Sequence, residues 1–281
     1  MTPLLSVWPD TALSDLSAPL FVLLLITAFA VSYLSGMVGL ALGIIRLPLL
    51  LAFGIPGPVA AGTNLAVSVL TAVTSGWHHY RAGRVAFRVV FMIGVPAFAG
   101  AFIGGLVSDD LRAWVLLALV ALILFWSGLV AVARGVRPRR VPAGGADSRA
   151  AAPPATPRRL AVESGVGFGV GVLGGAVGLV LGTVRMPALV NVLKLPPAIA
   201  IGTNTIIGLL VGASGFASHV LAGNLDVALI VALGGTGMVG SYLGARATGR
   251  MDADTLRLAV GIVLLVISPI MAYRSFLEFP G

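Results

Sequence analysis

The chain has 281 residues, of which 58% are hydrophobic and 10% are charged, and its formal net charge is +8. A soluble domain carries about 25% charged residues. The composition therefore excludes an ordinary soluble protein and predicts an all-α, polytopic transmembrane helical protein. Much of the positive charge lies in a Pro/Ala/Gly-rich interval at residues 134–160 and near expected helix ends. This distribution indicates a topology signal and argues against nucleic acid as a partner.

Ten apolar segments follow one another, and several approach the ~20 residues that a membrane-spanning helix needs. We expect them at residues 19–35, 37–53, 60–80, 87–107, 113–133, 161–176, 177–193, 198–221, 226–246 and 256–273. The first is interpreted as a retained transmembrane helix. The residues before it include Asp10 and Asp15 but no basic residue, whereas a cleaved signal peptide needs a basic start.

These segments suggest five regions along the chain. We predict an extracytoplasmic N-terminus (1–17), a first transmembrane repeat (18–133), a basic cytoplasmic linker (134–160), a second transmembrane repeat (161–275) and a C-terminal tail (276–281).

The second half of the chain repeats the first, and the motif at residues 36–64 recurs at 175–204. With an offset of 139, the paired residues are Gly39 with Gly178, Gly43 with Gly182, Arg46 with Arg185, and Pro48 with Pro187. With an offset of 140, they are Thr63 with Thr203, Asn64 with Asn204, and His79 with His219. Such a duplication is typical of transporters.

The orientation of the two halves depends on whether the motif segments cross the membrane. Short or broken crossings give five crossings per half and inverted repeats, whereas hairpins give four and parallel repeats. Counting five from an outside N-terminus places the basic residues 81–88 and the linker inside, and Asp109 and Asp110 outside. Counting four places both basic stretches outside. The positive-inside rule therefore predicts inverted repeats, each with a helix broken by proline and glycine.

Each motif places one arginine inside an apolar run, two residues before a proline. A charge at this depth costs at least a few kcal/mol, and such a residue faces a protein interior or a cavity. Guanidinium groups match oxyanions. We therefore predict a substrate site formed by Arg46 and Arg185, with Gly43 and Gly182 on the same helical stripes and backbone groups released by Pro48 and Pro187. Alternatively, the arginines reach an interface or bond those released carbonyls.

Polar residues beyond the motif are further candidates. Thr63, Asn64, Thr203 and Asn204 open the next expected segments, where they either cap a helix whose amides bind an anion or form interhelical hydrogen bonds. His79 and His219 are candidates for proton coupling. An interfacial histidine beside Trp77 and Tyr80 is the simpler interpretation. Ser35, Ser68, Ser75 and Ser214 are interpreted as helix-packing residues.

Patterns for catalysis are missing from the sequence. The one lysine, Lys194, follows no phosphate-binding glycine loop, and no His-Glu-x-x-His metal motif or mid-membrane aspartate occurs. We expect no enzyme activity, no cofactor and no metal.

The duplicated motif resembles the sulfite exporter TauE/SafE family. The resemblance rests on Pro48 and Pro187, on Ala61-Gly62-Thr63 and Ile201-Gly202-Thr203, and on helices that end in a histidine and a glycine (Gly83 or Gly223). It implies a permease for sulfur-containing anions such as sulfite or sulfonates. The family is richer in glycine at residues 40–42, is apolar at the two arginine positions, and commonly has serine at the two asparagine positions. These departures point to a subgroup with its own cargo.

The expected function is secondary active or facilitated transport of small anions, bound at mid-membrane between the repeats. The alternatives are an anion channel with an arginine selectivity ring and a membrane scaffold or sensor that acts through the basic linker. The expected partners are a small anionic substrate, the lipid bilayer and, optionally, a second copy in a homodimer. We expect a multi-pass protein of the plasma membrane.

Overall fold

The computed structural model describes residues 18–38, 42–136, 157–247 and 253–279. In these ranges the chain forms helices and no strand. The first half contains α1 (Ala18–Val38), α2 (Gly43–Ala52), α3 (Gly57–Arg81), α4 (Phe87–Val89), the π-helical turn η1 (Val90–Gly94), α5 (Val95–Leu106) and α6 (Ala113–Val136). The second half contains α7 (Pro157–Val177), α8 (Gly182–Pro187), the π-helical turn η2 (Ala188–Val192), α9 (Pro197–Leu221), α10 (Val227–Arg246) and α11 (Ala253–Leu277).

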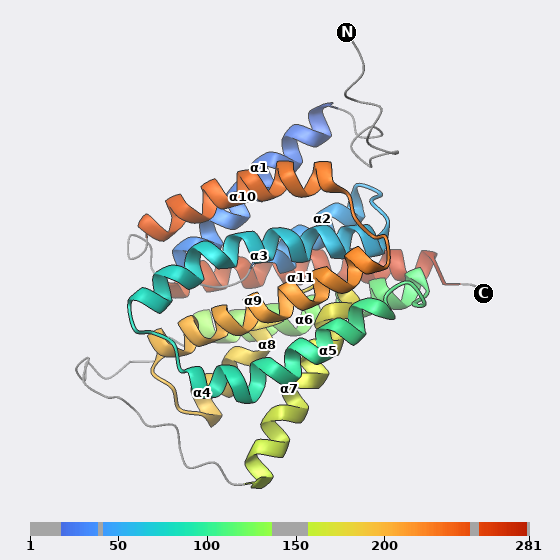
Figure 1. Cartoon of the computed structure of the whole chain (residues 1–281). Helices are drawn as coiled ribbons and strands as arrows, with labels where there is room; N and C mark the ends of the chain where they lie inside the picture. Colours follow the sequence, from blue (N-terminus) through green and yellow to red (C-terminus); the bar gives the residue numbers. More distant parts are fainter. Residues whose placement is uncertain (1–17, 39–41, 137–156, 248–252, 280–281) are drawn as a thin grey trace.

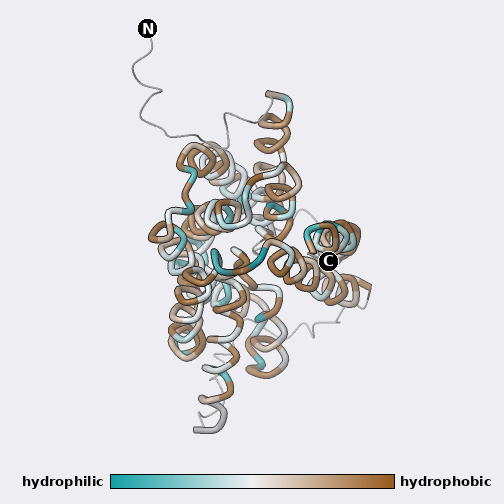
Figure 2. Tube along the Cα trace, turned by 90° about the vertical axis from the view of Figure 1, so that its right-hand side faces the viewer, coloured by the Kyte–Doolittle hydropathy of each residue, from teal (hydrophilic) through white to brown (hydrophobic). Residues whose placement is uncertain are grey.

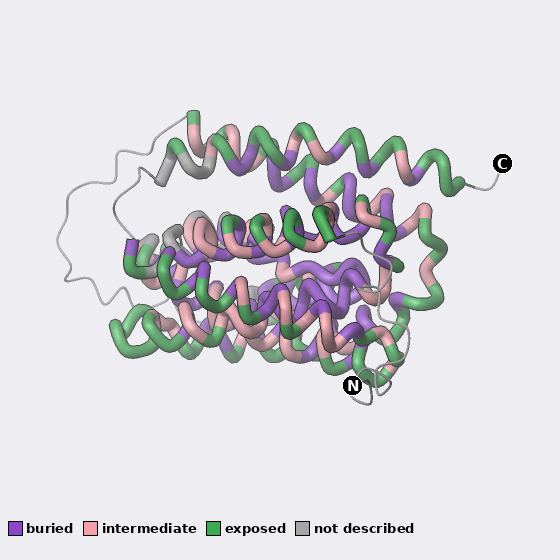
Figure 3. Tube along the Cα trace, turned by 90° about the horizontal axis from the view of Figure 1, so that it is seen from above, coloured by how far each residue is buried: buried purple, intermediate pink, exposed green. Residues whose placement is uncertain are grey.

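The helices confirm the prediction of an all-α, polytopic membrane protein. Seven helices in the described ranges are long and apolar enough to cross a membrane. Figure 2 shows hydrophobic residues along most of the helical trace. Seen from above, exposed positions line the outer sides of the helices and buried positions lie between them (Figure 3). Large apolar side chains on those outer sides, such as Phe91, Leu122 and Val231, are well exposed, as expected for contact with lipid.

The two motif segments form short helices. The α2 helix has 10 residues, and α8 continues into η2 for 6 and 5 residues. At 1.5 Å per residue each covers ~15 Å, about half of the hydrocarbon thickness. Pro48 lies inside α2 without ending it. In both repeats the interruption comes earlier, between α1 and α2 and between α7 and α8. In the second repeat Gly178 lies in this interruption with a φ of +76° that favours glycine.

Helices from one half pack against helices from the other. In Figure 1, α1 packs on α10, α5 on α7, α3 on α9, and α6 on α11. Glycines allow the closest approaches: Gly100 of α5 meets the carbonyl of Phe168, and the equivalent Gly240 of α10 meets the carbonyl of Phe29. The first helix of each half therefore packs on the fourth segment of the other, as expected of two related halves that interlock.

Equivalent helices of the two halves run in opposite directions. Gly62, near the start of α3, lies beside His219 at the end of α9, and Gly202, near the start of α9, lies beside His79 at the end of α3. The bonds from Ser268 to the Ala121 carbonyl and from Ser275 to the Trp114 carbonyl give α6 and α11 the same antiparallel relation. The orientation of each half in a membrane, and the five regions proposed along the chain, stay predictions.

Candidate functional site

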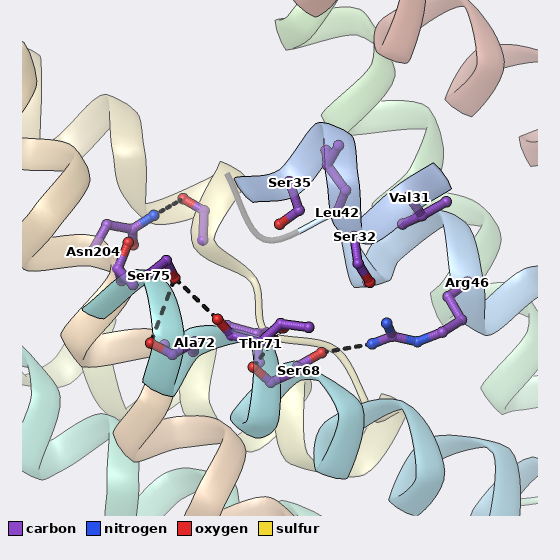
Figure 4. A pocket seen from close by; sticks show the side chains of 15 residues that line it. Val31, Ser32, Ser35, Leu42, Arg46, Ser68, Thr71, Ala72, Ser75 and Asn204 are labelled. Atoms are coloured by element: carbon purple, nitrogen blue, oxygen red, sulfur yellow. Dashed lines mark hydrogen bonds between the residues drawn. The ribbon is translucent and has the colours of Figure 1, made fainter. Parts of the chain in front are cut away.

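Arg46 is buried on α2, with 4% of its surface exposed, and its side chain points toward α3 (Figure 4). Its Nε donates to Oδ1 of Asn64 at 2.8 Å. Its Nη2 donates to the Asn64 carbonyl and to Oγ of Ser68, both at 3.0 Å. Both partners are neutral, so the positive charge of Arg46 is hydrogen-bonded without being compensated by a carboxylate through these contacts.

The next residues of this cluster join the two halves. Asn64 donates from Nδ2 to the carbonyl of Gly178 at 2.7 Å. A Cβ atom on Gly43 would lie 2.8 Å from Oγ of Ser68 and 3.2 Å from Nη2 of Arg46, so only glycine leaves room for these bonds. Arg46 and Asn64 thus connect α2, α3 and the interruption before α8.

The opposite end of α2 is fixed by α11. Nη1 of Arg274 donates to the Leu51 carbonyl at 2.6 Å. A cation near the carboxyl end of a helix satisfies a free carbonyl and interacts favourably with the helix dipole. The short helix that carries Arg46 is therefore held by polar contacts at both of its ends.

Arg185 is equally buried, with 3% of its surface exposed, but it has fewer partners. Its Nε lies 3.3 Å from Oδ1 of Asn204, which donates from Nδ2 to the carbonyl of Gly182 at 3.1 Å. The terminal nitrogens Nη1 and Nη2 of Arg185 are buried without a hydrogen-bond partner. A buried polar group without a partner costs ~1–3 kcal/mol, and more when it is charged.

One residue pair accounts for part of this difference. An offset of 140 relates Ser68 to Gly208, so the hydroxyl that accepts from Arg46 has no counterpart beside Arg185. A Cβ on Gly208 would lie 3.7 Å from Nη2 of Arg185, which places this glycine next to the unpartnered guanidinium. The duplicated arginines therefore have different surroundings.

A cavity of about 40 Å³ lies between the two motifs. It reaches from Arg46 and Ser68 on one side to Asn204 and Gly208 on the other. Hydroxyl groups dominate its polar lining, and Figure 4 shows them arranged around it. The lining comprises Val31, Ser32, Ser35, Leu42, Gly43, Arg46, Ser68, Thr71, Ala72, Ser75, Val180, Gly182, Asn204, Thr205 and Gly208.

The helix-capping prediction for the threonines and asparagines is wrong. The α3 and α9 helices begin earlier, after Pro56 and Pro196, so these residues lie in the second turn. Proline is well suited to helix starts because it lacks the amide hydrogen that would otherwise be unpaired there. Asn64 and Asn204 form interhelical bonds instead. Thr203 accepts from the amide of Ala86 at 2.9 Å.

The remaining predicted residues are dispersed. The hydroxyl of Thr63 is buried without a partner. Gly182 lines the cavity, and Pro187 ends α8. Gly39, another residue of the motif, lies outside the described residues.

The two histidines lie at the junction between α3 and α9. His219 is fully buried, and its Nε2 lies 3.1 Å from the Gly175 carbonyl. His79 is half-buried. Neither residue lines the cavity. Their role in proton coupling stays a prediction.

Sequence reasoning missed most of the cavity wall. The cavity wall includes Ser35, Ser68 and Ser75, for which the sequence predicts helix packing, and Ser32, Thr71, Thr205 and Gly208, for which it predicts no role. The spacing of Asn64, Ser68, Thr71 and Ser75 places all four on one face of a helix and is the signal that could have found them. Ser214 does contribute to packing, through its bond to the Phe98 carbonyl. Within the described residues, no cluster of His, Asp or Glu side chains could hold a metal.

Comparisons with known proteins agree with one another. The family model for the sulfite exporter TauE/SafE matches residues 24–271. The probable membrane transporter protein YunE of Bacillus subtilis is 26% identical over 271 residues, which cover 91% of this chain and 98% of that protein. The probable membrane transporter protein YdhB of the same organism is 26% identical over 240 residues, or 85% and 94% of the two chains. No solved structure matches.

Proposed function

The chain belongs to the sulfite exporter TauE/SafE family of membrane transporters, and from this premise we propose that it carries small anions, with sulfur oxyanions or organosulfonates as cargo. The anion binds in the cavity between the two motifs. The observation that carries the proposal is Arg185, whose two terminal nitrogens are buried without a partner. Arg185 is not itself a lining residue, but its Nη2 lies next to Gly208 of the cavity wall. The relatives are named as probable membrane transporters, which favours neither a channel nor a scaffold.

The chemistry of Arg185 suits an oxyanion. The two terminal nitrogens of a guanidinium form a flat fork that can donate to two oxygens of one sulfite, sulfonate or carboxylate group. An anion bound there supplies the hydrogen-bond partners that Arg185 lacks and compensates its charge. Arg46 contributes positive charge from the opposite side of the cavity, but its partners Asn64 and Ser68 also give it a structural role.

The size of the cavity favours a small cargo. A water molecule needs a cavity volume of ~10–15 Å³. The cavity, at about 40 Å³, has room for about three water molecules or an ion of similar size. Sulfite, with one sulfur and three oxygens, is in this range. A longer organosulfonate requires the cavity to widen around its organic part.

A thermal-shift titration of purified protein tests the proposal. Sulfite or methanesulfonate should raise the melting temperature of the wild type, and the shift should disappear in Arg185→Ala. Arg81→Ala, which changes an exposed arginine at the end of α3, is the matched control and should keep the shift. An equal shift in the wild type and in Arg185→Ala would remove Arg185 from the site. A shift with acetate alone would remove sulfur anions as the cargo.

We also propose that the two halves lie in the membrane with opposite orientations. The antiparallel relation between α3 and α9 supports this arrangement, because these helices are equivalent by repeat. The chain has no cysteine, so single cysteines report cleanly. Ala82→Cys and Ala222→Cys, which follow the ends of α3 and α9, should react with an impermeant maleimide from opposite sides. Reaction of both from the same side would contradict inverted repeats.

A further inference from the structure

The cavity extends along α3 but has no matching extension along α9. The face of α3 that carries Ser68 continues through Thr71, Ala72 and Ser75, all of which line the cavity. Beyond Ser68 these residues are half-buried. The equivalent positions on α9 are Gly208, Val211, Gly212 and Gly215, and all four are buried. Only Gly208 of this second set lines the cavity.

One pair of residues accounts for the closed side. Leu65 on α3 is fully buried, and a Cβ on Gly215 would lie 3.0 Å from its Cδ1 atom. The residue equivalent to Leu65 is Thr205, which lines the cavity on the α3 side. Where α9 faces a leucine, α3 therefore faces a threonine, whose Cγ2 would lie 3.8 Å from a Cβ on Gly76 and whose hydroxyl donates to the Ile201 carbonyl. The difference between the two sides of the cavity follows from different residues at equivalent positions, Leu65 and Thr205. It therefore does not depend on the conformation alone.

Hydrogen bonds hold the closed side to its neighbours. Oγ of Ser214 donates to the Phe98 carbonyl of α5 at 2.6 Å, and Nε2 of His219 lies 3.1 Å from the Gly175 carbonyl of α7. The equivalents on α3 make no such contacts within the described residues. Thr74 donates to the Leu70 carbonyl of its own helix. Nδ1 is buried without a partner in both His79 and His219, so the hydrogen bonding of the two histidines differs only at Nε2.

We propose that the anion reaches the cavity along the hydroxyl face of α3, formed by Ser68, Thr71 and Ser75 with Thr205 opposite, and that Leu65 is the gate that closes the equivalent path along α9. The inference rests on the proposed function for the identity of the cargo. Hydroxyls can replace part of the water around an anion, whereas a leucine side chain cannot. The hydroxyls of Thr71 and Ser75 now donate to backbone carbonyls of α3, and rotation about the C–O bond lets them donate to a passing anion.

Single-cysteine variants test the path. Thr71→Cys and Ser75→Cys should react with an impermeant maleimide at least an order of magnitude faster than the matched variant Val211→Cys, because only the α3 positions border the cavity. Reaction should occur from the side that labels Ala82→Cys. Methanesulfonate, which does not consume maleimide, should slow the reaction at Thr71→Cys. Equal rates at positions 71 and 211, or unreactive cysteines at both 71 and 75, would overturn the path.

The gate is tested by adding Leu65→Ala to Val211→Cys, which should raise the labelling rate of that cysteine severalfold. An unchanged rate in a variant that keeps its elution volume and melting transition would overturn the role of Leu65. Leu65→Ile serves as the control for a change of shape without loss of volume. If the α3 cysteines react rapidly but methanesulfonate gives no protection, access along α3 is supported and the proposal of an anionic cargo is contradicted. If methanesulfonate protects Thr71→Cys but Val211→Cys reacts as fast as Thr71→Cys, binding of the anion is supported. The difference between the two paths, and with it the role of Leu65 as a gate, is then contradicted.

Discussion

The two motifs of this chain carry the same arginine into different surroundings. Arg46 bonds Asn64 and Ser68, whereas Arg185 has one long contact to Asn204 and two terminal nitrogens without a partner. One residue that separates the two cases is Ser68, which is replaced by Gly208 in the second motif. Arg185 also lacks a bond like the one from Nη2 of Arg46 to the Asn64 carbonyl. The duplication thus gives two buried arginines, of which the neighbouring helix provides hydrogen-bond partners for the terminal nitrogens of only one.

The largest effect on folding is expected from Arg46→Ala. Removal of this side chain leaves Asn64 and Ser68 without their partner in a buried position, which costs ~3 kcal/mol. The measurement is the midpoint of chemical denaturation in detergent without ligand. A denaturation midpoint for Arg46→Ala at or above that of Arg185→Ala would contradict the different roles of the two arginines.

Arg185→Met should separate binding from stability. Methionine keeps much of the apolar volume but removes a buried cation with two unpartnered nitrogens. Replacement of an incompletely paired buried charge by a hydrophobic group is often neutral or stabilising by ~1–4 kcal/mol. We expect a melting temperature without ligand at or above that of the wild type, together with loss of the anion-dependent shift. A clear drop in the ligand-free melting temperature would indicate that Arg185 is structural, like Arg46.

Gly208→Ser should make the second motif resemble the first. The new hydroxyl would lie near Nη2 of Arg185, and the added Cβ would approach Cγ1 of Val180 at 2.9 Å, which Val180 can relieve by a small shift. Because a neutral hydrogen bond then competes with the ligand, we expect anion affinity to fall about fivefold, equivalent to ~1 kcal/mol. Gly208→Ala is the matched control, since it adds the carbon without the hydroxyl. Equal losses in the two variants would assign the effect to crowding.

Ser68→Gly is the reciprocal change, and its effect is expected on stability. It removes one of the hydrogen bonds that Nη2 of Arg46 donates, while the bond to the Asn64 carbonyl remains. We expect a stability loss of ~1 kcal/mol for the bond and about as much again for glycine inside a helix. Ser68→Ala isolates the first contribution. A variant that gains anion affinity would show that Ser68 alone keeps Arg46 from acting as a ligand.

The sequence by itself determined the helical class, the duplication and the presence of one arginine in each apolar motif segment. Apolar segments and their charged ends gave helix limits close to those observed, because burial in a membrane imposes a strong hydrophobic pattern on each span. The family resemblance was also available from the motif, through residues such as Pro48 and Gly62, and the family match over residues 24–271 confirms it. The repeat alignment placed Asn64 and Asn204 near their arginines in the chain.

Only the tertiary structure decided what each of these residues contacts. Whether a guanidinium has partners depends on side chains 18 to 23 residues away on another helix, as with Asn64, Ser68 and Gly208. The capping prediction failed because Pro56 and Pro196 start the helices earlier than the hydrophobic pattern suggested. The packing of α3 on α9, and of α1 and α2 beside α3, sets which faces enclose the cavity. These are contacts across long sequence separations, and the periodicity of one segment carries no information about its neighbour in space.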